Sequence, residues 1–237
     1  FINDDEIKLI LASRGGYGTI RTLELIDVDK LVKTPKYFAG FSDITALHCY
    51  LNCKFNIPTI HSPLISTLRP KHTDVNAINQ FGDLISGNIY NFYLDPEILN
   101  KYGVTKGKIV GGNLSVIYSM QSTPYEIETD GNVLFIEDLD EYLYHIDRMM
   151  MNLKYSGKLK NLKGLIVGGM SDMHDNKTPF GKSAYEIIFD AVKEYDYPVC
   201  FNFPAGHKKD NFSFVLGVEI LMNVSDSGTE IIYNIDN

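Results

Sequence analysis

An alternation of strand-like and helix-like segments constrains the fold of this chain more than any other feature of its sequence. The apolar run 7–12 leads into a glycine-rich turn, and residues 19–31 show helical spacing. Pro35 then breaks the chain, residues 37–41 form the next strand-like run, and a helix-like segment covers 44–51. This order predicts a parallel sheet with helices packed against it. Because parallel strands are normally buried on both faces, we interpret 7–12 as an interior strand that lacks its earlier neighbours.

The rest of the chain continues the α/β pattern after a break. Residues 71–104 are polar and aromatic with weak periodicity, so we interpret them as a connection between a first domain at 1–70 and a second at 105–237. The later segments that we expect are strands at 133–136, 164–168 and 198–201, helices at 74–85, 142–155 and 183–195, and an antiparallel hairpin of 212–224 with 229–235. The predicted fold class is α/β, with a parallel sheet in the first domain and a mixed second domain.

The composition is that of an ordinary globular chain. The 237 residues are 44% hydrophobic and carry a net charge of −8 without a basic stripe, which argues against a nucleic-acid partner. No apolar stretch approaches the ~20 residues that span a bilayer, so we expect no membrane partner. We interpret Cys49, Cys53 and Cys200 as buried thiols of a reducing compartment, the cytoplasm. No His, Cys and Asp cluster has metal-site spacing, so we expect neither metal nor cofactor.

The turn Gly40-Phe41-Ser42-Asp43 joins an expected strand directly to an expected helix. A serine on such a turn projects its hydroxyl beyond the carboxyl edge of the sheet, beside free N–H groups that can stabilise an oxyanion. This is the geometry of a nucleophile elbow, although Ile44 replaces the second glycine of the usual G-x-S-x-G pattern. In the alternative interpretation, Ser42 and Asp43 only cap the helix, a role that both residue types favour.

Two further polar side chains share this local design of a strand followed by a functional group. Glu137 follows the strand 133–136, and His207 follows 198–203. Open α/β sheets build their sites at the carboxyl ends of parallel strands. A serine nucleophile needs a base, and the base needs a carboxylate; serine, acid, histidine is one of the known chain orders for such a triad. Glu141 is the rival acid, and Glu137 is preferred because it directly ends the strand.

A set of short motifs occurs in order through essentially the whole chain. The motifs are Arg14-Gly15-Gly16-Tyr17-Gly18, Pro35-Lys36, Gly40-Phe41-Ser42-Asp43-Ile44-Thr45-Ala46-Leu47, Gly111-Gly112-Asn113-Leu114, Leu134-Phe135-Ile136-Glu137-Asp138, Tyr144-His145-Ile146-Asp147-Arg148-Met149 and Pro204-Ala205-Gly206-His207. This ordered set resembles the LD-carboxypeptidase family of serine peptidases, which also includes the microcin-immunity hydrolases. Family members carry a further N-terminal segment that this chain lacks, so its first domain is expected to be partial.

The resemblance implies a two-domain fold with the active site at the domain interface. Ser42 of the first domain would be the nucleophile, and Glu137 and His207 of the second would be the carboxylate and the general base. The backbone N–H groups of Gly16 and Asp43 would form the oxyanion hole.

The glycine-rich loop and one further motif supply the candidate substrate-binding residues, which are Arg14, Tyr17 and Asn113. Two alternatives for the loop stay open: it could cradle phosphate on helix N–H groups, or be rich in glycine merely to turn tightly. The loop does not match a dinucleotide-binding fingerprint. Asn113 could lie near the substrate or serve only for close packing.

By this resemblance the chain would be a metal-free serine carboxypeptidase that releases the terminal D-Ala from the murein tetrapeptide in cell-wall recycling. Its partner would be this small peptide, and a homodimer remains open. An alternative of the same class is cleavage of aminoacyl-nucleotide conjugates, as in microcin immunity; the chain has no Trp to clamp a nucleobase, although Tyr and Phe could substitute. A second alternative is a catalytically silent peptide-binding module.

Overall fold

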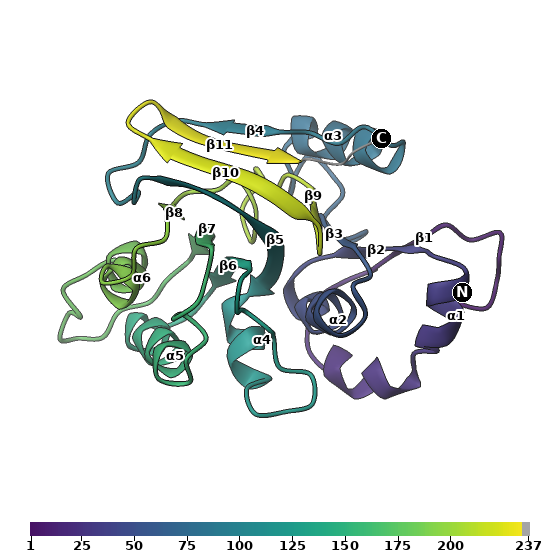
Figure 1. Cartoon of the computed structure of the whole chain (residues 1–237), viewed down its shortest axis with the longest axis horizontal. Helices are drawn as coiled ribbons and strands as arrows, with labels where there is room; N and C mark the ends of the chain where they lie inside the picture. Colours follow the sequence, from purple (N-terminus) through teal and green to yellow (C-terminus); the bar gives the residue numbers. More distant parts are fainter. Residues whose placement is uncertain (234–237) are drawn as a thin grey trace.

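Two β-sheets and the helices around them form a mixed α/β structure. The computed structural model describes residues 1–233. The smaller sheet is built mainly from the first part of the chain and lies beside the larger one (Figure 1). The α/β fold class predicted from the sequence is confirmed.

The smaller sheet has the strand order β1-β2-β3-β9, formed by Leu9–Leu11, Tyr37–Gly40, Thr59–His61 and Phe214–Leu216. β1, β2 and β3 run parallel, but β9 comes from the C-terminal part of the chain and pairs antiparallel with β3. The prediction of one strand over 212–224 is therefore wrong. The strand breaks at Gly217, whose φ of +82° favours glycine. β1 stands at the edge of this sheet among residues 1–233, in agreement with the expectation of a strand at 7–12 that lacks earlier neighbours.

The larger sheet has the order β4-β11-β10-β5-β6-β7-β8, formed by Phe92–Leu94, Gly228–Tyr233, Glu219–Ser225, Gly103–Asn113, Val133–Leu139, Gly164–Ser171 and Val199–Cys200. The first half of β5 pairs antiparallel with β10, and its second half pairs parallel with β6. The strands β5 to β8 run parallel, so their carboxyl ends meet at one edge. β10 and β11 form the predicted hairpin, whose expected last residue, Ile235, lies outside the described residues.

The helical elements are η1 (Thr19–Leu25), α1 (Val28–Lys33), η2 (Ser42–Ile44), α2 (Thr45–Cys49), η3 (Tyr50–Lys54), α3 (Val75–Ile85), α4 (Leu114–Ser119), α5 (Leu143–Tyr155) and α6 (Ala184–Val192). The single helix expected at 19–31 is wrong, because Ile26 is extended and the Asp27 side chain caps a second helix. The predicted connection 71–104 contains α3 and β4, and β4 joins the larger sheet. The domain boundaries stay a prediction.

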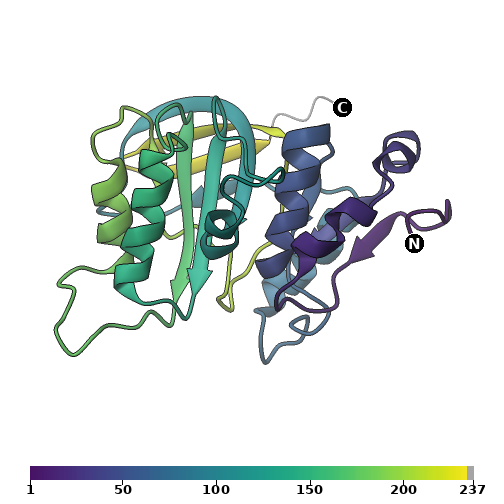
Figure 2. The ribbon, with the colours of Figure 1, turned by 90° about the horizontal axis from the view of Figure 1, so that it is seen from below.

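Apolar side chains cover both faces of β6. Leu134 and Ile136 pack in the core beneath α4, α5 and α6, which cover one face of the sheet (Figure 2). Val133 and Phe135 point to the opposite face and pack in a second core with residues of β9, β10 and β11. Because side chains alternate along a strand, four consecutive apolar residues are needed here, and Glu137 directly continues them.

Two findings bear on the surroundings of the chain. No helix among residues 1–233 is long and apolar enough to cross a membrane. All three cysteines are free thiols; Cys49 and Cys200 are buried, whereas Cys53 is only half-buried.

Candidate active site

The turn after β2 holds Ser42 in a conformation that residues with a side chain rarely adopt. The φ of Ser42 is +65°, in the left-handed region, and the short helix η2 begins at this residue. Neither η2 nor the following α2 has a side-chain hydrogen bond at its N-cap. The structure therefore shows a sharp strand-to-helix turn of the nucleophile-elbow kind rather than the capping alternative.

Two glycines make room for this turn. A Cβ atom on Gly15 would lie 3.0 Å from Oγ of Ser42, so the glycine-rich loop passes directly against the hydroxyl group. A Cβ atom on Gly40 would lie 3.0 Å from both Cβ of Ala12 and Cγ1 of Ile44. Ile44 stands where the usual motif has its second glycine. Its side chain packs against Gly40, the first glycine of the motif.

Asp43 fastens the glycine-rich loop to the elbow. Its Oδ2 accepts hydrogen bonds from the backbone N (2.9 Å) and from Oγ1 (2.6 Å) of Thr19, the first residue of η1. Gly16 has a φ of +123° and open space where a Cβ would stand. Arg14 and Tyr17 are exposed in the same loop. The loop is therefore placed beside Ser42, and the roles of Gly16, Asp43, Arg14 and Tyr17 toward a substrate stay predictions.

Glu137 and His207 form a buried hydrogen-bonded pair. The Oε2 atom of Glu137 accepts from the His207 backbone N (3.2 Å) and lies 2.7 Å from His207 Nδ1. β6 extends through Glu137 to Leu139, beyond the predicted end at 136, with a register shift between Ile136 and Asp138. A Cβ on Gly206 would lie 2.8 Å from Oε2 of Glu137, so only glycine allows this close approach.

The environment of His207 favours its protonated form. Burial alone lowers the pKa of the imidazole, but the hydrogen bond and the charge of Glu137 outweigh it, and the pKa is raised. When Nδ1–H donates to the carboxylate, Nε2 keeps its lone pair and can act as a base. The side chain of His207 retains 14% of its exposure, so a substrate can reach it.

The rival carboxylate is engaged elsewhere. The Oε2 atom of Glu141 lies 2.6 Å from Nδ1 of His145, one helical turn along the chain. Of the two glutamates, Glu137 is therefore the one that contacts His207.

An aromatic contact brings the elbow to the histidine. The ring of Phe41, the residue before Ser42, lies 4.6 Å from the His207 ring, centroid to centroid. Phe41 also contacts the ring of His61, at 5.7 Å. Because Phe41 is buried and contacts both imidazoles, the turn that carries Ser42 lies next to His207 in the loop after β8.

Asn211 and His61 support the loop of His207, and sequence reasoning assigned neither of them. Oδ1 of Asn211 accepts from the backbone N of Gly206 (2.9 Å) and lies 3.0 Å from Nε2 of His61. Burial lowers the pKa of His61 to about 3, so its imidazole is neutral. The only signals for these residues were a buried-strand histidine and an amide four residues after His207.

Asn113 lies at the contact between α2 and β5. Its Oδ1 accepts from Val116 N at 3.1 Å and caps α4, and its Nδ2 donates to Oδ1 of Asp138 at 2.9 Å. A Cβ on Gly112 would lie 2.3 Å from Thr45 Oγ1, so this glycine permits close packing of α2 on β5. The side chain of Asn113 is thus occupied by structural bonds, and a substrate role stays a prediction.

Asp138 is a second buried carboxyl group that sequence reasoning missed. Burial and then the charge of Glu137 raise the pKa of Asp138 to about 7. Backbone N–H groups of Leu139 and Ser115 donate to it, both at 2.9 Å. Its position directly after Glu137 was the available signal. Among residues 1–233, no three His, Cys, Asp or Glu side chains are grouped so as to hold a metal ion.

Comparison with known proteins places this geometry in a family. Residues 1–62 match the model of the LD-carboxypeptidase N-terminal domain, and residues 106–222 match that of the LD-carboxypeptidase C-terminal domain. The chain is 34% identical to a probable murein peptide carboxypeptidase of Bacillus subtilis, over 94% of this chain and 71% of that protein. The chain belongs to the LD-carboxypeptidase family. A putative carboxypeptidase of Rickettsia conorii is 29% identical, over 88% of this chain and 65% of that protein.

Solved structures of similar fold extend the comparison. The muramoyltetrapeptide carboxypeptidase from Oxalobacter formigenes has a TM-score of 0.88 and 26% identity, and the match covers 100% of this chain and 81% of that one. The microcin C7 self-immunity protein MccF, in complex with aspartyl sulfamoyl adenosine, has a TM-score of 0.84 and 20% identity, over 100% of this chain and 79% of its own. At that identity the likeness to MccF shows the fold alone.

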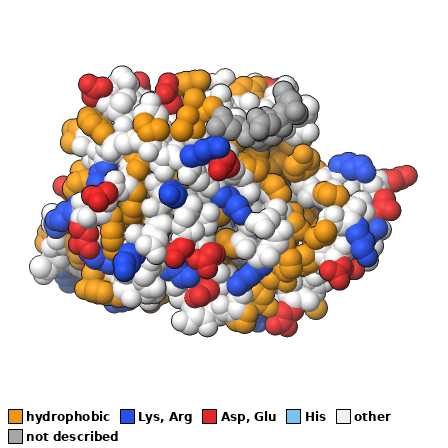
Figure 3. Space-filling model, in the orientation of Figure 1, with side chains coloured by type: hydrophobic (Ala, Val, Ile, Leu, Met, Phe, Trp, Pro, Cys, Tyr) orange, Lys and Arg blue, Asp and Glu red, His pale blue; other side chains and the backbone are white. Residues whose placement is uncertain are grey.

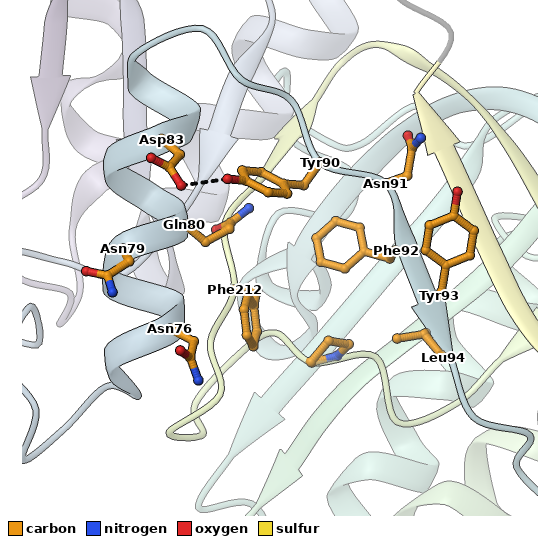
Figure 4. A pocket seen from close by; sticks show the side chains of 11 residues that line it. Asn76, Asn79, Gln80, Asp83, Tyr90, Asn91, Phe92, Tyr93, Leu94 and Phe212 are labelled. Carbon is orange, nitrogen blue, oxygen red and sulfur yellow. Dashed lines mark hydrogen bonds between the residues drawn. The ribbon is translucent and has the colours of Figure 1, made fainter.

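Different residues of the segment 204–212 line two cavities of this LD-carboxypeptidase family member. The larger, about 540 Å³, lies between α3 and β4 and is lined mainly by aromatic and amide side chains; Tyr90 donates a hydrogen bond to Asp83 at its rim (Figure 4). It contains none of the predicted site residues. The smaller cavity, about 360 Å³, is lined by His207 and Phe41.

Proposed function

We propose that this chain is a serine carboxypeptidase that hydrolyses an LD peptide bond and releases the terminal D-Ala from the murein tetrapeptide. The observation that carries the proposal is the 2.7 Å contact between Glu137 and His207, formed beside the turn of Ser42. The name of the Bacillus subtilis relative, a murein peptide carboxypeptidase, supports the substrate. Free thiols fit a cytoplasmic role in cell-wall recycling, which we propose on the same basis.

In the proposed reaction, Oγ of Ser42 attacks the carbonyl carbon of the LD bond, and Nε2 of His207 takes the hydroxyl proton. The buried carboxylate of Glu137 fixes the tautomer of His207 and stabilises the imidazolium that forms. The backbone N–H groups of Gly16 and Asp43 hold the oxyanion. His207 then gives its proton to the leaving amine, D-Ala departs, and a water molecule activated by His207 cleaves the acyl-enzyme.

A comparison of substrates tests this function. The protein is incubated with the LD-linked tetrapeptide, with its LL diastereomer and with aspartyl sulfamoyl adenosine, and the products are followed by mass spectrometry. We expect the terminal alanine to be released from the LD peptide, as D-Ala, and not from the LL diastereomer. Cleavage of the nucleoside conjugate alone would instead support a microcin-immunity activity. No cleavage by folded protein would support the silent binding module.

A further inference from the structure

The cavity of about 360 Å³ beside His207 is basic. Lys71, His72, Lys208 and Lys209 line it, and no Asp or Glu does. We call it the basic cavity. These basic side chains come from two segments far apart in the sequence, one after β3 and the other in the loop that carries His207.

Its charge contrasts with the rest of the molecule. The chain carries a net charge of −8, and acidic and basic side chains are interspersed over the face shown in Figure 3. Lys208 is paired with Asp210 at 3.1 Å. Among residues 1–233, neither Lys71 nor Lys209 has a carboxylate oxygen within the 4.0 Å of an ion pair. Two positive charges without an ion-pair partner that line one cavity favour an anionic ligand.

Backbone hydrogen bonds fix the two segments that carry these lysines. The Asp74 N–H donates to the carbonyl oxygen of Lys209 at 2.7 Å and joins the segments directly. The Thr73 hydroxyl donates to the carbonyl oxygen of Thr67 at 2.8 Å and closes the turn before it. The backbone that carries both lysines is therefore fixed before a ligand binds, which reduces the entropy that binding costs.

The proposed reaction decides which part of a substrate lies here. The group that accepts the serine proton also protonates the leaving amine, so the leaving residue must stand against the accessible edge of His207. His207 itself lines the basic cavity, so these lysines border the space beside its ring. In a carboxypeptidase the leaving residue carries a free α-carboxylate. We propose that Lys71 and Lys209 bind the terminal carboxylate of the residue that is released, and so restrict the enzyme to chain ends; this inference rests on the proposed function.

The test measures binding separately from turnover. In the Ser42→Ala variant, which cannot turn over, calorimetry compares the LD tetrapeptide with its C-terminal amide. We expect the acid to bind about tenfold more tightly than the amide, as for one hydrogen bond to a charged group. Adding Lys71→Gln or Lys209→Gln should remove most of this preference, and added salt should weaken it. Lys160→Gln, an exposed lysine outside the cavity, is the matched control and should preserve it.

Equal binding of acid and amide, no measurable binding of the acid, or a preference that survives both lysine substitutions would overturn the inference. Wild-type turnover of the same peptide tests the proposed function independently. An inactive wild type whose Ser42→Ala form still discriminates acid from amide would refute the function and retain the site. An active wild type whose Ser42→Ala form binds acid and amide equally would support the function and refute the carboxylate site. In an active background, the lysine variants should raise KM and leave kcat nearly unchanged.

Discussion

Nδ1 of His207 lies 2.7 Å from Oε2 of Glu137, and the glutamate side chain has no exposed surface. The pair joins the loop after β8 to the carboxyl end of β6, and Phe41 seats the Ser42 turn against it. The carboxylate makes its hydrogen bonds to the backbone and ring of the same residue. Both the position and the charge of the imidazole therefore depend on Glu137.

This dependence predicts the pH profile. Only neutral His207 can accept the serine proton, so kcat/KM should rise with pH through the raised pKa of His207. Glu137→Gln removes the group that raises this pKa, so the acidic limb should move to lower pH while the plateau falls by about 10³-fold or more. Glu141→Gln is the control and should change neither. An unmoved limb in Glu137→Gln would contradict the assignment.

The left-handed backbone of Ser42 predicts that replacing it by glycine increases stability while activity is lost. At a φ of +65° alanine is as strained as serine, whereas glycine is not. Ser42→Ala should therefore have nearly the wild-type free energy of unfolding, and Ser42→Gly should be more stable by about 1 kcal/mol. Both should lack activity. Urea denaturation of the three proteins checks this, and a Ser42→Gly variant no more stable than Ser42→Ala would show that the turn is unstrained.

A comparison of alanine substitutions at Gly206 and Gly181 distinguishes the effect of packing against Glu137 from that of backbone strain. In Gly206→Ala the new Cβ would stand 2.8 Å from Oε2 of Glu137, so the Glu137–His207 contact must shift and activity should fall by at least tenfold. Gly181 also has a positive φ, but nothing lies within 4 Å of the position that a Cβ would take there. Gly181→Ala should therefore lower the free energy of unfolding by about as much as the backbone strain does in Gly206→Ala, and kcat should not change. Equal activity in the two variants would contradict the prediction.

Asp138 predicts a pH-dependent contribution to stability. Its pKa is raised from 3.8 to about 7 by burial and by Glu137. A carboxyl group with a higher pKa in the folded state stabilises the fold below its unfolded pKa, and this contribution is lost as pH rises from about 4 to about 7. The difference in unfolding free energy between wild type and Asp138→Asn should decrease across that window, by on the order of 4 kcal/mol at most. A difference that stays constant with pH would contradict it.

Local signals explain what could be predicted from the sequence. Short local patterns place Ser42, Glu137 and His207 at the ends of strands. These patterns are the apolar run of β6 and the glycines at 40 and 206, and each spans only a few residues, so the three positions could be predicted. Spacing alone could not decide between Glu137 and Glu141, because both lie near the strand end. The contact that decides is tertiary, because Glu137 meets His207, 70 residues later, whereas Glu141 contacts His145 one helical turn away.

Other features depend on contacts that no local pattern encodes. β9 is not part of the expected hairpin. It pairs instead with β3, which lies over 150 residues earlier in the chain. The Asn211 amide and the lysines of the basic cavity come together only after the two segments have folded onto each other. The helix expected at 19–31 ends at Ile26 although its apolar spacing continues.

Labelling with a fluorophosphonate probe, mapped by mass spectrometry, tests most directly whether Ser42 is a nucleophile activated by the Glu137–His207 pair. The account predicts a single modified serine, Ser42, in the wild type. It also predicts strong loss of labelling in His207→Ala and Glu137→Gln, both shown to be folded, and full labelling in Glu141→Gln. Absence of labelling in folded wild type, or labelling of Ser42 that is unchanged in His207→Ala, would contradict it.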